Sequence, residues 1–379
     1  MGAPLLSVKH LSTEFRTERG TVKAVDDVSF DLQAGETLAI VGESGSGKSV
    51  TAMSILRLIP NPPGRITSGE VVFDGQNLLK LDDQAIRAIR GNRIAMIFQE
   101  PMSSLNPSLT VGLQIAEPIN LHRKTPWAKA MDMAAELLAR VRLPDARSRV
   151  KSYPHQFSGG MRQRAMIAMA LACQPQLIIA DEPTTALDVT VQAQILALLK
   201  EVTRAANSAL ILITHDLGVV ARYADRVCVM YGGRIVEAGP AREIYARPKH
   251  PYTIGLMASI PRLDQEAGQR LVPIEGQPPN LAKLPPGCAF APRCRRAADV
   301  CRKERPPLAQ SAPDHLSACH FHAQLACSRS PRNRAGGPRP QGPFSGHGGR
   351  RGAQAGRQRE GGRRRFVHRA SRRDARPGG

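Results

Sequence analysis

One stretch of eight residues has the residue types and the spacing needed to bind a phosphate chain. It runs through Gly42, Glu43, Ser44, Gly45, Ser46, Gly47, Lys48 and Ser49. An apolar run at 37–41 precedes it and a helical pattern at 49–58 follows, which is the setting of a P-loop. The glycines would let the backbone wrap a phosphate at a helix N-terminus, where free N–H groups favour anions. Lys48 would reach the β- and γ-phosphates, and the Ser49 hydroxyl would bind Mg²⁺.

Three further apolar runs end in polar side chains. The runs at 94–98, 177–180 and 209–214 are followed by Gln99, by Asp181 and Glu182, and by His215. Polar groups at the carboxyl ends of strands in an α/β sheet lie where ligands bind. Two adjacent carboxylates beside a P-loop suit Mg²⁺ binding and water activation. We therefore expect these side chains to lie at the ligand-binding edge of the sheet.

Two other features could contact a nucleotide. Ser158 can cap the helix that follows it, and Gly159 and Gly160 would let the N-terminus of that helix approach an anion closely. Phe15 precedes the P-loop and could stack on an adenine ring, although a core aromatic residue at a strand end explains it equally well.

The pattern of the chain predicts how these groups are positioned. Residues 5–41 and 68–75 have the character of strands, 111–172 is largely helical, and a helix is expected from 189 to 205. The sequence therefore predicts an α/β fold of the P-loop NTPase type. From Pro248 onward the chain is rich in proline, which indicates an irregular extension on the core and not another α/β unit.

Charge and hydropathy limit the location and the partners. The net charge is +21, but residues 328–379 hold fifteen arginines against one Asp and one Glu, which leaves +8 for the other 327 residues. The basic character is therefore mostly a property of the tail. No apolar run approaches the roughly 18 residues of a membrane span, and the N-terminus lacks the layout of a signal peptide. We expect a cytoplasmic protein that contacts a membrane through partners.

Five of the seven cysteines lie between 288 and 327. A cytosolic ATPase gives little reason to expect disulfides there. Four thiolates in a short proline-rich segment suit a metal or an iron–sulfur cluster, but the spacing lacks the paired C-x-x-C of common zinc sites. A cluster, a zinc ion and unliganded structural thiols all stay open. The candidate ligands are Cys288, Cys294, Cys301 and Cys319.

Taken together, these motifs resemble the ATP-binding cassette (ABC) transporter ATPases in order and spacing. The resemblance covers residues 5 to about 325. The stretches 157–161, 247–253 and 287–294 also resemble the ATPase subunits of bacterial dipeptide and oligopeptide importers. That family implies a mixed-sheet core with a helical subdomain, here an ATPase domain at 1–246 with an insert at about 100–175. A Cys- and Pro-rich extension at 247–326 and a tail at 327–379 would follow.

The resemblance also implies roles for single residues. Lys48 and Ser49 would hold phosphate and Mg²⁺, with Asp181 on Mg²⁺ through water. Glu182 would act as general base or would orient the water. Gln99 would sense Mg²⁺ and contact the permease side, and His215 would hold the γ-phosphate. In a head-to-tail dimer, the Ser-Gly-Gly motif would meet the partner's ATP, with Ser158 and Gly160 binding it beside Gly159. Asp188 is a further cofactor-binding residue that the resemblance implies. Some members of the subgroup are understood to hold a [4Fe–4S] cluster at cysteines like these.

The same resemblance implies partners and a location. We expect a heterodimer with a second homologous ATPase, two membrane permeases and an extracytoplasmic solute-binding protein, at the cytoplasmic face of the bacterial inner membrane. The transported solute would be a dipeptide or oligopeptide; nickel and glutathione are alternatives. A soluble ABC ATPase acting on nucleic acid is less consistent, because the chain has one P-loop and only 109 positions separate Ser49 from Ser158. We expect no specific nucleic-acid partner.

The tail has no apolar periodicity, and its composition predicts disorder. Read in the neighbouring frame, one GC-rich back-translation of 363–378 gives a peptide that resembles residues 24–30 and 35–38 of this chain. We therefore hypothesise that the tail is an out-of-frame reading of the start of a second cassette ATPase gene.

Overall fold

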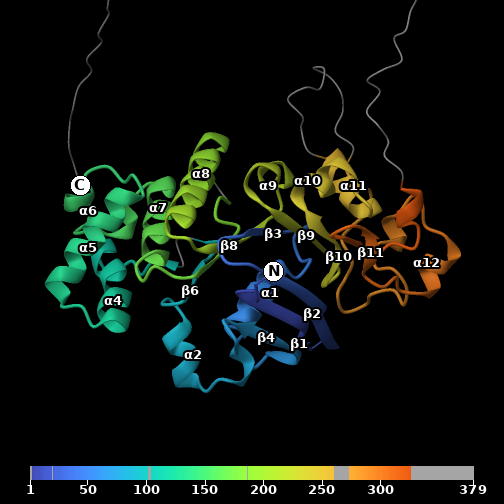
Figure 1. The fold of residues 1–379 in the computed structure, drawn as a ribbon, viewed down its shortest axis with the longest axis horizontal. Helices are drawn as coiled ribbons and strands as arrows, with labels where there is room; N and C mark the ends of the chain where they lie inside the picture. The colour runs from blue at the N-terminus through green and yellow to red at the C-terminus, as the bar shows by residue number, and fades with distance from the viewer. Residues whose placement is uncertain (1, 19, 101–103, 186, 260–272, 326–379) are drawn as a thin grey trace, which may run out of the picture. The chain divides into compact units, whose positions relative to one another are not determined.

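The computed structural model describes residues 2–18, 20–100, 104–185, 187–259 and 273–325. The expected tail at 327–379, and with it the out-of-frame hypothesis, lies outside the described residues. Within the described part, an eight-stranded mixed sheet packs against a four-stranded antiparallel sheet and several helices (Figure 1). No helix there combines the length and the apolar composition needed to cross a bilayer.

The strands form two sheets. The four-stranded sheet has the order β2-β1-β4-β5 and the larger sheet the order β11-β12-β10-β9-β3-β8-β7-β6. The strands are β1 (Leu6–Thr17), β2 (Gly20–Leu32), β3 (Thr37–Val41), β4 (Gly64–Phe73), β5 (Gln76–Asn77), β6 (Ile94–Ile97), β7 (Leu177–Asp181), β8 (Ala209–Thr214), β9 (Arg226–Tyr231), β10 (Arg234–Pro240), β11 (Ala309–Ala312) and β12 (His315–Ser317).

The helices cover both faces and one edge of the larger sheet. They are α1 (Lys48–Ile55), α2 (Asp83–Ile89), α4 (Val111–Arg123), α5 (Trp127–Arg140), α6 (Ala146–Arg149), α7 (Gly159–Ala170), α8 (Val189–Ala205), α9 (Leu217–Tyr223), α10 (Ala241–Ala246), α11 (Pro251–Ala258) and α12 (Asp299–Lys303). Helices α4 to α7 lie in the chain between β6 and β7, where the sequence predicts a helical insert. The exact domain boundaries stay predictions.

The central strand β3 shows why the core has several layers. All five of its residues are buried, as expected for a parallel strand covered on both faces. Leu38 and Ile40 point into the core shared with the antiparallel sheet. Ala39 and Val41 point to the opposite side, into a core with residues of α9, α10 and α11. The period-2 alternation of a strand thus joins two cores through one sheet.

Parallel pairing brings the predicted site residues to one edge. β3 pairs in parallel with β8 and β9, and β7 pairs in parallel with β6 and β8. The carboxyl ends of β3, β6, β7 and β8 therefore point the same way. The P-loop follows β3, Gln99 comes shortly after β6, and His215 follows β8. Asp181 is the last residue of β7, and Glu182 comes next.

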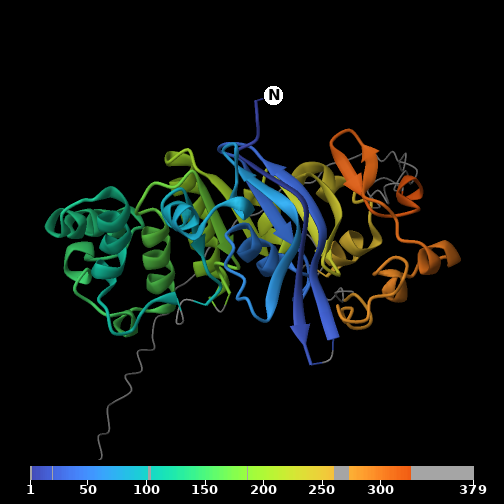
Figure 2. The same ribbon diagram turned by 90° about the horizontal axis from the view of Figure 1, so that it is seen from below.

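The C-terminal extension is more regular than the sequence predicts. Strand β12 pairs with β10, and β11 pairs with β12, so the extension lengthens the larger sheet at the edge opposite β6 (Figure 2). Phe290 of the extension joins the core beside α11. The two strands have only four and three residues, too few for an alternating pattern to be visible.

Candidate functional site

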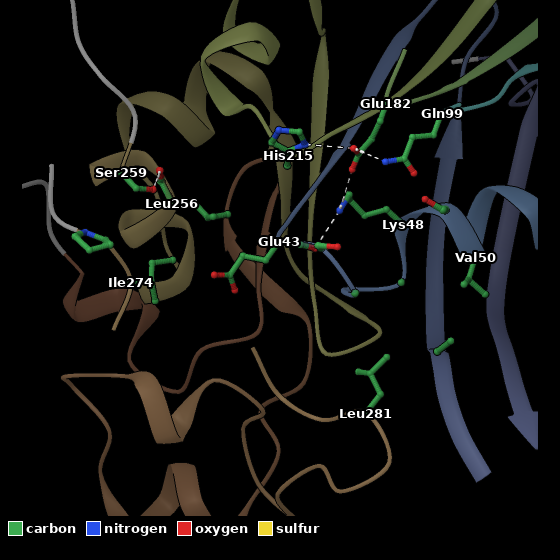
Figure 3. Close-up of a pocket in the computed structure, with 16 residues that line it drawn as sticks. Glu43, Lys48, Val50, Gln99, Glu182, His215, Leu256, Ser259, Ile274 and Leu281 are labelled. Atoms are coloured by element: carbon green, nitrogen blue, oxygen red, sulfur yellow. Dashed lines mark hydrogen bonds and ion pairs between the residues drawn. The ribbon is translucent and has the colours of Figure 1, made fainter. Parts of the chain in front are cut away.

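A cavity of about 780 Å³ opens at the carboxyl ends of the strands (Figure 3). This volume is in the range of small-molecule sites, about 300–1,000 Å³. The predicted residues that line it come from the P-loop and from three strand ends. They are Glu43, Ser44, Gly45, Gly47, Lys48, Ser49, Gln99, Glu182 and His215.

The P-loop has the backbone that a phosphate cradle needs. Gly45 and Gly47 have φ of +77° and +102°, where other residues are strained. A Cβ on Gly47 would overlap the carbonyl oxygen of Ala24. The Ser46 hydroxyl oxygen is buried and has no hydrogen-bond partner among the described residues. An orphaned donor in a glycine loop at the start of α1 fits a phosphate ligand.

Lys48 is held inside this loop by its own backbone. Its Nζ donates to the carbonyl oxygens of Gly42 at 2.9 Å and Glu43 at 3.0 Å. It also lies 3.9 Å from a carboxylate oxygen of Glu182. Burial lowers the pKa of Lys48, and attraction to Glu182 and Asp181 opposes that shift. The ammonium group would regain favourable charge contacts on meeting a phosphate.

Ser49 and Asp181 form the pair expected at a Mg²⁺ ion. The Ser49 hydroxyl donates to Oδ1 of Asp181 at 2.9 Å, across 132 positions of sequence. Burial raises the pKa of Asp181, and the hydrogen bond from Ser49 lowers it. Hydroxyl and carboxylate oxygens are ligands that Mg²⁺ accepts, so these two residues fit the ion chemically.

Glu182 is the point at which the other polar groups meet. Its Oε2 accepts from Gln99 Nε2 at 3.1 Å and from Thr185 Oγ1 at 3.0 Å, and it lies 3.4 Å from His215 Nδ1. Figure 3 shows Gln99, His215 and Lys48 pointing towards this carboxylate. Glu182 has φ of +44°, a strained conformation for a non-glycine residue of the kind often found at functional sites.

The Ser-Gly-Gly motif does not line this cavity. Ser158 accepts from Met161 N at the start of α7, and Asp188 accepts from Val191 N at the start of α8. Both side chains are therefore helix caps. A Cβ on Gly160 would lie 3.0 Å from Val191, so the two helix starts are packed closely together. The structure brings the two motifs next to each other, away from the P-loop cavity of the same chain.

Phe15 also lies outside the residues that line the cavity. It is half-buried in β1, and a Cβ on Gly64 would lie 2.8 Å from its ring. Its predicted role at an adenine ring is untested and stays a prediction.

Several residues at the site have no signal in the sequence pattern. Leu256, Ile274 and Leu281 form an apolar part of the cavity wall, far from the P-loop in sequence. Thr185, next to Glu182 in the fold, follows it by three positions and could have been found as a neighbouring hydroxyl.

The four candidate cysteines line one small cavity. Cys288, Cys294, Cys301 and Cys319 surround it together with apolar side chains. Burial raises the pKa of Cys288 and Cys294, and raises that of Cys319 to about 11. All four are free thiols. Within the described ranges, no group of three or more His, Cys, Asp or Glu is arranged to hold a metal ion.

Two family models match the chain. The ABC transporter model matches residues 25–185. The model described as oligopeptide/dipeptide transporter, C-terminal region, matches residues 236–301.

Curated relatives match over most of their length. A putative peptide import ATP-binding protein of Brucella melitensis is 52% identical over 333 residues, which is 85% of this chain and 98% of the relative. The dipeptide transport ATP-binding protein DppD of Bacillus subtilis is 52% identical, covering 85% of this chain and 96% of the relative. The oligopeptide transport ATP-binding protein OppD of Salmonella typhimurium is 53% identical, covering 83% and 93%.

Solved cassettes share the fold of the core. A dimeric ATP-binding cassette in a post-hydrolysis state, bound to ADP and Pi, aligns with a TM-score of 0.57 and 29% identity. The alignment covers 62% of this chain and 99% of that one. A dimeric bacterial ABC transporter cassette gives a TM-score of 0.56 and 30% identity.

Proposed function

Because this chain belongs to the ABC transporter ATPases and carries the C-terminal region of the oligopeptide/dipeptide transporters, we propose that it energises the import of peptides across a membrane. It is an ATPase, and ATP is its substrate. The main structural support is that the P-loop, Glu182, Gln99 and His215 line one cavity. The names of its relatives favour peptides over nickel or glutathione.

In the proposed site, the P-loop binds the phosphates of ATP. Lys48 exchanges its bonds to the loop carbonyls for bonds to the β- and γ-phosphates, and Ser46 gains the partner that it lacks. Ser49 would hold Mg²⁺, and Asp181 would hold it through water. The ion would supply charge neutralisation to the phosphate oxygens.

Glu182 is proposed as the general base for the attacking water. This role is supported by its position directly after Asp181 and by the 3.9 Å between its carboxylate and the Lys48 ammonium. Gln99 and His215 contact the same carboxylate. Gln99 would sense Mg²⁺, and His215 would hold the γ-phosphate.

The Ser-Gly-Gly motif is proposed to serve the ATP of a second cassette. Ser158, Gly159, Gly160 and Asp188 lie together but away from the P-loop cavity of their own chain. A head-to-tail pair of cassettes would bring them to the partner's nucleotide. We propose a related, non-identical ATPase as that partner.

Two permeases and a solute-binding protein complete the proposed importer, with this subunit at the cytoplasmic face of the inner membrane. The permeases would dock on the region around Gln99–Pro107, of which the structure describes 99–100 and 104–107. Exposed apolar side chains beside it support this site: Phe98, Leu109 and Leu113 are each about 40% exposed.

The four cysteines are proposed to hold a [4Fe–4S] cluster. The lining of one small cavity by all four cysteines supports this, because such clusters are held by Cys thiolates. Anaerobically purified protein should be brown, with iron and sulfide near four each per chain. Colourless protein with one zinc per chain would refute the cluster.

The proposed function is tested on the assembled importer in proteoliposomes. Peptide-loaded binding protein should stimulate ATP hydrolysis, and peptide should accumulate only when ATP is present. Transport of nickel or glutathione without peptide transport would assign another solute.

A further inference from the structure

An arginine of the C-terminal extension contacts a side chain of the P-loop. Arg293, in the 3₁₀ turn Ala291–Arg293, forms a two-pronged ion pair with Glu43. Its Nη1 lies 2.6 Å from Oε2 of Glu43, and its Nη2 lies 3.0 Å from Oε1, across 250 positions of sequence. The Arg293 side chain is 6% exposed. A buried, bidentate arginine–carboxylate pair is a strong and directional contact.

Arg293 is itself held in one orientation. Its Nε donates to the carbonyl oxygen of Glu275 at 3.0 Å, and its Nη1 lies 3.3 Å from the Tyr231 hydroxyl. The guanidinium also lies over the rings of Tyr231 and Phe290, 5.9 Å and 6.0 Å from their centres. These contacts hold the Arg293 guanidinium in one orientation in the absence of ATP. Less side-chain entropy is therefore lost when ATP binds.

Each polar group of Glu43 has a hydrogen-bond or ion-pair partner. Its N–H donates to the Tyr252 hydroxyl at 2.8 Å, and its carbonyl oxygen accepts from Lys48 Nζ at 3.0 Å. In Figure 3 its side chain points away from Lys48, towards Ile274 and α11. The carboxylate thus belongs to the P-loop but is paired with the extension.

Charge gives this pair a function beyond packing. Glu43 lines the cavity that the phosphates of ATP would enter. An unpaired carboxylate in the wall of this cavity would repel a triphosphate, because water screens like charges only weakly in a partly desolvated site. Arg293 cancels that charge and fixes the second residue of the loop. Ile274 and Leu281, also from the extension, complete the wall of the same cavity.

We propose that Arg293 is a positioning residue of the ATP site, which neutralises Glu43 and holds the P-loop in the shape that binds phosphate. The C-terminal extension is then a part of the nucleotide site and not only an appendage. This inference rests on the proposed ATP site at Lys48.

The test measures ATP affinity of the purified full chain by titration calorimetry. Arg293→Met should weaken ATP binding by about tenfold, the scale of one uncompensated charge near an anion. Glu43→Gln in the Arg293→Met background removes the repelling charge and should recover most of that loss. Arg293→Lys keeps the positive charge but cannot form the two-pronged pair with the carboxylate. Its ATP affinity should lie between those of wild type and Arg293→Met.

A matched control lies two positions along the chain. Arg295 pairs with Glu275 at 2.6 Å, but both side chains are about 70% exposed. Arg295→Met should leave ATP affinity unchanged. Thermal unfolding of each variant separates folding from binding, since a purely structural Arg293 would lower the melting temperature of Arg293→Met without weakening ATP binding by the folded protein.

Different variants test the role of Arg293 and the ATP site itself. Wild-type affinity in Arg293→Met, or no recovery in the double variant, would overturn the role of Arg293. Unchanged ATP affinity in Lys48→Ala would instead refute the proposed ATP site.

Discussion

Replacing Glu182 by glutamine removes a carboxylate while keeping its shape. The side chain is 13% exposed and contacts Gln99, Thr185 and His215, so an amide of the same size fits the same space. The backbone stays in place as well, because Glu182 N donates to the Ile213 carbonyl oxygen at 2.9 Å. The change therefore tests the chemistry of the group and not the fold.

The expected loss follows from the proposed role. Removing one general base typically costs about 10²–10⁴-fold in rate, or about 3–5 kcal/mol of barrier. ATP binding should not weaken, because the variant removes a negative charge 3.9 Å from Lys48, beside the phosphate site. We expect Glu182→Gln to bind ATP and to be trapped in a closed dimer.

The assay compares steady-state ATP hydrolysis and ATP affinity of the assembled transporter. Glu201→Gln is the matched control, because Glu201 is exposed on α8 and pairs with Arg142. It should hydrolyse ATP at the wild-type rate. Near-normal hydrolysis by Glu182→Gln would remove this residue from the role of general base.

Three further predictions concern the P-loop and the tail. Gly47→Ala should destabilise the fold by about 1–3 kcal/mol and abolish ATP binding, because the new Cβ would overlap the Ala24 carbonyl oxygen. Gly75 also has a positive φ, but the space around its Cβ position is open, so Gly75→Ala should keep ATP binding. ATP affinity should fall as pH rises through the pKa of Lys48, because only the protonated amine attracts phosphate; burial lowers this pKa below its usual 10.5. Lys48→Arg should remove this loss of affinity at alkaline pH. A pH profile that is the same in Lys48→Arg and wild type would refute the role of Lys48. Truncation after Ala326 should leave ATPase activity and assembly unchanged, and the out-of-frame hypothesis fails if the alternative reading frame does not continue into a second P-loop.

The sequence pattern was sufficient to predict the P-loop edge of the sheet. Strong apolar runs at 177–180 and 209–214 became β7 and β8, and a predicted helix at 189–205 became α8. These elements are decided by local periodicity, so the pattern of residues alone could place their polar end residues at one edge. The mixed sheet and the cassette fold were predicted correctly from the motifs.

The contribution of the extension could not be predicted in the same way. Strands β11 and β12 form because β10 offers an edge for pairing, and their own residues carry little β-pattern. The Arg293–Glu43 pair joins segments 250 positions apart. Contacts of this kind depend on tertiary packing, and no local spacing indicates them.

Peptide uptake into proteoliposomes tests the proposed function most directly. The vesicles contain this subunit with the proposed second ATPase, permeases and solute-binding protein. In the wild type, ATP supplied on the side of the membrane that carries the ATPase subunits should drive peptide accumulation. Lys48→Ala should abolish both ATP hydrolysis and peptide uptake. Peptide uptake that continues in Lys48→Ala, or hydrolysis that peptide-loaded binding protein never stimulates, would contradict the proposed function.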